Sequence, residues 1–305
     1  MRVVLEEESL RDGLQAESRL FGLTEKMEIV RLLAAAGVRR LQLGSFVNPR
    51  SVPQVANTDV LAALVRREFP DILCTAQVFN EKGLERAIRS GLAHLGVPVW
   101  ISDTLSRLHT GRPMAEGVEV ATRLIASATT AGIDICAGIQ CAFGGVGEGP
   151  LSEAEVLAAI APLAAAGARA IDLADSTGTA HPLSVKRLAS AVREAYPEVE
   201  LSLHLYDTRG LGLVNMYAGY EAGVRVFGTA AGGLGGGTCG DGALGNVATE
   251  DAVHLFQGMG VDTGIDLSLF CRVVARFEAL LERQLPGRMT RVLRGRREEG
   301  LSGGR

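Results

Sequence analysis

The sequence of 305 residues predicts an α/β protein built as a closed (β/α)8 barrel, or TIM barrel, with a C-terminal helical extension. Apolar runs of strand type alternate with helical patterns along the chain, which is typical of a parallel sheet with helical crossovers. Eight such units fit the usual barrel size of about 250 residues. After the first strand the chain has Arg11-Asp12-Gly13-Leu14-Gln15 instead of a glycine-rich phosphate-binding sequence, which disfavours an open doubly wound sheet.

Each strand is predicted where a short apolar, often β-branched run stands between turn signals. These runs occupy residues 3–5, 40–44, 72–78, 93–99, 133–143, 168–173, 199–206 and 224–227. Helical patterns occupy residues 24–36, 58–67, 81–90, 113–131, 152–166, 182–196, 211–222, 246–259 and 267–283. Thr24 and Ser152 are suited to cap helix N-termini, and Gly37 and Gly167 are suited to end helices. We predict a barrel domain at 1–285 and an Arg- and Gly-rich tail at 286–305, which is either flexible or an arm over a partner subunit.

The composition excludes several classes of protein. Hydrophobic residues make up 47% of the chain and charged residues 22%, which allows a large buried core. A net charge of -4 and an aromatic content of 5% argue against nucleic-acid binding. No apolar stretch reaches the ~20 residues of a membrane span, and the N-terminus turns acidic too early for a secretory signal. The five cysteines include no CxxC pair, so neither a disulfide framework nor a structural zinc site is indicated. We expect a soluble, cytoplasmic protein.

A glycine-rich loop follows the last predicted strand. Residues 228–242 contain eight glycines together with Cys239, and Asn246 stands at the loop's end. Glycine permits unusual backbone angles and close approach to a ligand, although a flexible linker has a similar composition. The cysteine, the asparagine and the position directly after a strand favour an active-site loop.

In a TIM barrel the active site lies at the C-terminal ends of the strands. Polar residues of this chain that fall at those ends come from all parts of the sequence: Arg11, Asp12, Gln15, Gln42, Ser45, Gln140, Asp175, Ser176, His204, Tyr206, Asp207, Cys239 and Asn246. They are distant in sequence but are predicted to share one mouth.

Three of these residues suit a hard divalent cation. Strand alternation places His204 on the same face as Ser202 and Tyr206, which in a barrel is the inner face. The carboxylate of Asp12, the imidazole of His204 and the amide of Asn246 form an open ligand set suited to Mg²⁺ or Mn²⁺. Each residue also has a structural interpretation. Asp12 would be a turn residue, His204 a hydrogen-bonded histidine in a strand, and Asn246 the N-cap of a helix.

Arg11 lies directly beside Asp12. Its guanidinium can hold a carboxylate or an enolate oxygen through several donors. The structural alternative is an ion pair with Asp12 or Glu17.

Three stretches resemble hydroxymethylglutaryl-CoA lyase, namely residues 10–17, 44–54 and 231–251, within an overall similarity that spans residues 1–285. The resemblance implies a superfamily of metal-dependent TIM-barrel lyases that cleave or form carbon–carbon bonds next to a carbonyl. It implies that Asp12, Asn246 and the two histidine positions of a His-x-His motif bind the cation. It further implies that Arg11 stabilises an enolate and that a loop cysteine takes part in acid/base chemistry.

The chain departs from the family pattern at three positions. The His-x-His motif is His204-Leu205-Tyr206 here, so a phenol stands in place of the second imidazole. Gln42 replaces the acidic residue at the end of the second strand, which removes a charge near the metal. The loop thiol, Cys239, comes two positions late.

The resulting expectation is a carbon–carbon lyase that uses Mg²⁺ or Mn²⁺. It would cleave a 3-hydroxy-3-methylglutaryl-CoA-like thioester to an acyl-CoA enolate and a keto acid, so its partner would be a small acyl-CoA or hydroxy-acid substrate. The residues predicted to take part in catalysis are Arg11 and Cys239. Those predicted to bind the substrate are Gln15, Gln42, Ser45 and Asp175. Those predicted to bind the metal are Asp12, His204, Tyr206 and Asn246. The alternatives are a Claisen-type synthase of the same superfamily and a barrel that has lost catalysis and serves as a scaffold. A homodimer is compatible with all three.

Overall fold

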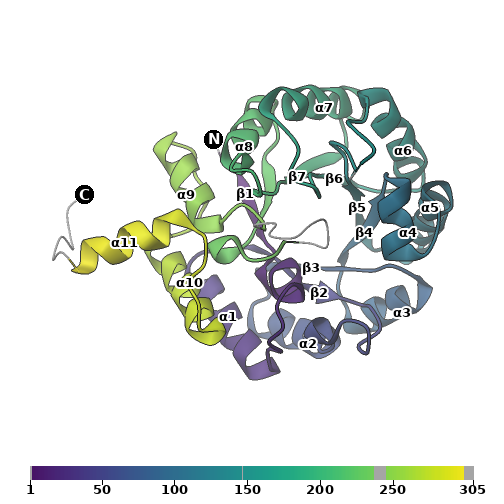
Figure 1. Ribbon diagram of the computed structural model, residues 1–305. Coiled ribbons are helices and arrows are strands. Elements are labelled where there is room, and N and C mark those ends of the chain that lie inside the picture. The colour runs from purple at the N-terminus through teal and green to yellow at the C-terminus, as the bar shows by residue number, and fades with distance from the viewer. Residues whose placement is uncertain (1, 146, 237–244, 299–305) are drawn as a thin grey trace.

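The structure, a computed structural model, describes residues 2–145, 147–236 and 245–298. Its centre is a closed barrel of parallel strands in chain order, and this confirms the predicted fold class (Figure 1). The strands are β1 (Val4–Glu7), β2 (Arg40–Ser45), β3 (Leu73–Gln77), β4 (His94–Trp100), β5 (Asp134–Gln140), β6 (Ala170–Ala174), β7 (Glu200–His204) and β8 (Val226–Thr229).

Helices surround the barrel as an outer ring (Figure 1). The described helices are α1 (Leu23–Ala35), α2 (Thr58–Glu68), α3 (Glu81–Ser90), α4 (Asp103–Thr110), α5 (Met114–Thr130), α6 (Glu153–Ala165), α7 (Pro182–Ala195), α8 (Gly212–Glu221), α9 (Thr249–Gly258), α10 (Leu267–Leu281) and α11 (Arg288–Glu298). The last of these, α11, packs on α9 and α10 and projects away from the ring (Figure 1). Short turns of π-helix at η1 (Ser9–Gly13) and 3-10 helix at η2 (Pro53–Val55) and η3 (Ala231–Gly233) complete the described elements. Among the described residues, no helix is both long and apolar enough to cross a membrane.

The two faces of the barrel differ in chemistry. Strand residues that point outward, such as Leu41, Ile171 and Leu203, are fully buried against the helices and form the hydrophobic core. Alternate residues on the same strands, such as Gln42 and Asp172, point into the barrel and line an internal cavity. Barrel interiors of this fold are usually filled by branched apolar side chains. Here small and polar residues leave open space beneath the mouth.

Two helices were not predicted. Ser102 caps α4 by accepting a hydrogen bond from the backbone N–H of Leu105 at 3.2 Å, and Gly111 ends the helix with a φ of 73°. At the other end of the chain, α11 occupies part of the tail for which the sequence predicted either flexibility or an arm over a partner subunit. Asp251 holds the start of this helix because its carboxylate accepts from the backbone N–H groups of Arg288 and Met289, at 2.9 and 2.7 Å.

Candidate active site at the mouth of the barrel

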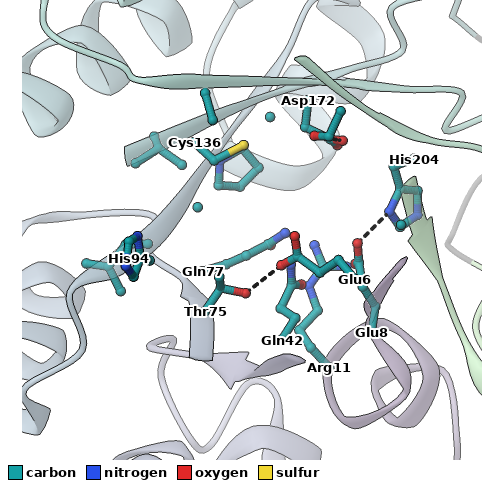
Figure 2. Close-up of a pocket in the computed structure, with 18 of the residues that line it drawn as sticks. Glu6, Glu8, Arg11, Gln42, Thr75, Gln77, His94, Cys136, Asp172 and His204 are labelled. Atoms are coloured by element: carbon teal, nitrogen blue, oxygen red, sulfur yellow. Dashed lines mark hydrogen bonds and ion pairs between the residues drawn. The ribbon is translucent and has the colours of Figure 1, made fainter. Parts of the chain in front are cut away.

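A cavity of about 280 Å³ lies inside the barrel. Arg11, Asp12 and Tyr206 line it at the mouth, and Arg40 and His94 line it toward the opposite end. Figure 2 shows side chains from several strands converging on this space, among them Glu8, Asp172 and His204. The cavity is therefore bordered by charged groups that are far apart in the sequence.

Asp12 is the centre of the cluster at the mouth. It lies on η1, directly after β1, and one of its oxygens, Oδ2, accepts hydrogen bonds from Asn246 Nδ2 at 2.8 Å and from the Tyr206 hydroxyl at 3.3 Å. Arg11 forms an ion pair with the other oxygen. Burial alone would raise the pKa of Asp12, but Arg11, His204 and the two hydrogen bonds outweigh burial and lower it. The carboxylate is thus held in its charged form.

Asn246 reaches the same cluster from beyond β8. Its amide nitrogen also donates to the backbone oxygen of Leu234 at 2.8 Å, whereas its side-chain oxygen is buried and has no hydrogen-bond partner among the described residues. Gly235 makes this approach possible: its φ is 102°, and a Cβ there would lie 2.5 Å from Asn246 Nδ2 and 2.7 Å from Asp12 Oδ2. A buried amide oxygen without a partner costs free energy, which is a common feature of a site that binds a ligand.

His204 ends β7 and is buried beside Tyr206, with a distance of 5.4 Å between the ring centroids. Its Nδ1 lies 3.0 Å from Glu8 Oε1. Burial alone would lower the pKa of His204, but the negative charge of Glu8, then those of Asp12 and Asp172, raise it to about 9. The imidazole is therefore strongly attracted to the surrounding carboxylates.

The cluster fits a hard divalent cation. It offers a carboxylate that stays charged, an unpartnered amide oxygen, an imidazole and a phenol oxygen, which together match the ligands that Mg²⁺ and Mn²⁺ use. No group of three or more His, Cys, Asp and Glu side chains in the described part of the chain is arranged to hold a metal ion. A cation would therefore need Asn246 or Tyr206 in addition to Asp12 and His204.

The structure brings most of the predicted site residues to the mouth, but not all of them. Gln42 lines the cavity, and its buried side-chain oxygen has no hydrogen-bond partner among the described residues. Ser45 is buried nearby in β2 without a partner for its hydroxyl in that same part of the chain, and it is absent from the cavity lining. Gln15 is exposed and also lies outside the lining. Cys239, the predicted acid/base residue, lies outside the described residues.

Asp175 has a structural use that the sequence did not reveal. Its carboxylate accepts hydrogen bonds from the backbone N–H groups of Thr179 and Ala180, at 2.9 and 3.1 Å, and so orders the loop after β6. The neighbouring residue, Ser176, lines the cavity and donates to the side-chain oxygen of Gln140 at 3.2 Å.

Three inward-facing carboxylates were missed by the sequence analysis. Glu6 and Glu8 follow the strand parity of β1, and Asp172 lies on β6. Burial raises the pKa of Asp172 to about 6, although the nearby charge of His204 opposes the shift. The i, i+2 spacing of Glu6 and Glu8 could have indicated that both side chains face inward, but the strand predicted from the sequence ends at Leu5, before both residues.

Comparisons with known proteins agree with this architecture. The chain matches the HMGL-like family model over residues 2–276. It is 39% identical over 285 residues to an (R)-citramalyl-CoA lyase of Chloroflexus aurantiacus, covering 90% of each chain. It is 33% identical over 274 residues to a hydroxymethylglutaryl-CoA lyase of Pseudomonas mevalonii, covering 89% of this chain and 90% of that protein. An HMG-CoA lyase from Acinetobacter baumannii, solved with coenzyme A and 3-methylmalate, has a TM-score of 0.88 and 32% identity, covering 95% of this chain and 94% of its own.

The closed barrel, the cluster at its mouth and these relatives define a TIM-barrel carbon–carbon lyase. The chain belongs to the HMGL-like family. The family resemblance seen in the sequence is therefore confirmed.

Proposed function

We propose that this protein is a divalent-metal-dependent lyase that cleaves a 3-hydroxy-3-carboxyalkyl acyl-CoA thioester, similar to 3-hydroxy-3-methylglutaryl-CoA, to an acyl-CoA enolate and a keto acid. Relatives named as lyases of citramalyl-CoA and hydroxymethylglutaryl-CoA support this substrate class. The observation that carries the proposal is the cluster of Asp12, His204, Tyr206 and Asn246 at the mouth, with the Asn246 side-chain oxygen buried and unpartnered within the described residues.

Asp12, His204, Tyr206 and Asn246 would hold the cation. When bound there, Mg²⁺ or Mn²⁺ would polarise the tertiary hydroxyl of the substrate and an adjacent oxygen and so lower the pKa of that hydroxyl. Transfer of the hydroxyl proton to solvent would turn the C–O bond into a carbonyl while the neighbouring carbon–carbon bond breaks, and the electron pair of that bond would move into the thioester to form the enolate. Burial strengthens these electrostatic effects because the effective dielectric constant inside the protein is lower than in bulk water.

Arg11 would stabilise the enolate. One of its terminal nitrogens is engaged with Asp12, whereas its buried Nε has no hydrogen-bond partner among the described residues. The guanidinium therefore lies beside the proposed cation site and keeps a donor for developing negative charge. A proton delivered to the α-carbon, the role predicted for Cys239, would then turn the enolate into the acyl-CoA.

The test is turnover of purified full-length protein on hydroxymethylglutaryl-CoA and citramalyl-CoA with Mg²⁺ or Mn²⁺, with both products identified by mass spectrometry. Arg11→Ala should lower kcat about 10²–10³-fold while it leaves Mn²⁺ binding in place. Asp12→Ala should abolish both Mn²⁺ binding and turnover. Absence of cleavage of both thioesters and related 3-hydroxyacyl-CoA analogues would contradict the proposal, and absence of Mn²⁺ binding as well would favour a scaffold barrel.

A further inference from the structure

The contact between Glu8 and His204 spans three strands. His204 ends β7, Glu8 follows β1, and β8 lies between these two strands in the barrel. Neighbouring strands are about 4.8 Å apart, so side chains on β7 and β1 start roughly 10 Å apart. The carboxylate and the ring can meet at 3.0 Å only by passing over the inner face of β8.

Gly228 is the residue of β8 at the crossing point. It pairs with His204 on one side and with Glu6 on the other. A Cβ at Gly228 would lie 2.6 Å from Glu8 Oε1 and 2.9 Å from His204 Nδ1, closer than real Cβ contacts come. Gly228 does not have a positive φ, so its backbone conformation does not require glycine. The missing side chain is needed for space, and the space is filled by the Glu8–His204 contact.

The contact with Glu8 determines which nitrogen of the His204 imidazole can bind a cation. With Nδ1 donating to Glu8, Nε2 is the nitrogen that can bind a cation once it has released its proton. Metal-binding histidines usually donate their second nitrogen to a carboxylate or a carbonyl, which fixes the ring and increases its basicity as a ligand. Tyr206 supplies a phenol where the family pattern has a second imidazole, so the ligand strength of His204 matters more in this chain.

We propose that Glu8 is a positioning residue that holds His204 by Nδ1 across the gap left by Gly228 and so directs Nε2 at a divalent cation beside Asp12 and Asn246. The inference rests on the proposed metal-dependent function. It makes Glu8, Gly228 and His204 one unit: removal of the carboxylate or filling of the gap should weaken cation binding in the same way.

The test measures the Kd of Mn²⁺ alone for the metal-free, full-length chain by isothermal titration calorimetry, together with a thermal melt of each variant. Glu8→Ala should raise the Kd of Mn²⁺ about 10–100-fold, the usual range for loss of such a partner. Glu8→Gln keeps an acceptor oxygen for Nδ1 and should recover part of this loss. Gly228→Ala should weaken binding as much as Glu8→Ala, and the double variant should be no weaker than either single variant.

The matched control is Glu6→Gln. Glu6 lies two residues earlier, on β1, and also faces the inside of the barrel, but it pairs with Arg40 at 2.7 Å and with Thr75 at 2.6 Å instead of His204. The Kd of Mn²⁺ for Glu6→Gln should stay within twofold of the wild-type value. If Glu8→Ala does not fold, Glu8→Gln and Gly228→Ala carry the test.

Three results would overturn the inference. One is a Kd of wild-type value in Glu8→Ala or, if that variant is unfolded, in Gly228→Ala. The second is an equal loss of affinity in Glu6→Gln, which would indicate a general disturbance of the barrel interior. The third is a wild-type protein that binds no Mn²⁺, which would also remove the metal-dependent function, whereas the first two leave that function intact.

Discussion

Glu250 gives the sharpest prediction about stability. It lies in the first turn of α9 and is fully buried, with Oε2 accepting from the backbone N–H of Gly232 at 3.0 Å. Burial, supported by the nearby charges of Asp251 and Glu7, raises the pKa of Glu250 from 4.5 to about 8. Between these two pH values the folded protein keeps the proton and the unfolded chain has lost it.

The sign of the pH effect follows from proton counting. Because the folded state binds more protons, the free energy of unfolding falls as the pH rises from 4.5 toward 8. The contribution of Glu250 is fully present below pH 4.5 and falls by about 1.4 kcal/mol per pH unit. Between pH 5 and pH 8 this amounts to about 3–4 kcal/mol.

Glu250→Gln removes the titrating group and keeps an acceptor oxygen for Gly232. Urea unfolding of the metal-free full-length protein, followed by circular dichroism at pH 5, 6, 7 and 8, should show that the variant gains stability relative to the wild type as the pH rises. Glu68→Gln is the control, since Glu68 is on the surface and its pKa is lowered by Arg31, outside this pH window. Parallel stability curves for the wild type and Glu250→Gln would refute the reasoning.

Two further predictions concern packing and the cation site. Gly44→Ala should lower the free energy of unfolding by about 1–3 kcal/mol because its Cβ would lie 2.2 Å from the Thr58 hydroxyl and 3.2 Å from the Thr58 Cβ. Gly258→Ala, where nothing lies within 4 Å, should instead add about 0.5–1 kcal/mol; equal urea midpoints for the two variants would contradict this contrast. Tyr206→Phe loses the hydrogen bond to Asp12 and should weaken Mn²⁺ binding roughly tenfold, whereas Tyr206→His should tighten it. If calorimetry finds the same Kd of Mn²⁺ for the wild type, Tyr206→Phe and Tyr206→His, Tyr206 is not part of the cation site.

The order of strands and helices could be predicted from sequence because it depends on local patterns. Alternating apolar runs, caps and helix-ending glycines such as Gly37 act over a few residues, and a closed barrel follows from their number. The prediction did not extend to α11, because that helix begins where Asp251, 37 residues earlier, accepts its first backbone N–H groups. A cap supplied by another helix leaves no local signal.

Local sequence patterns were enough to predict which chemical groups stand at the strand ends: a carboxylate and a guanidinium after β1, an imidazole on β7 and an amide beyond β8. The pairing of these groups depends on the folded barrel. Glu8 and His204 are 196 positions apart and meet because barrel closure places β8 between their strands with a glycine at the crossing. Strand register in a closed barrel is a property of the whole sheet, so no local pattern could indicate which carboxylate would face the imidazole.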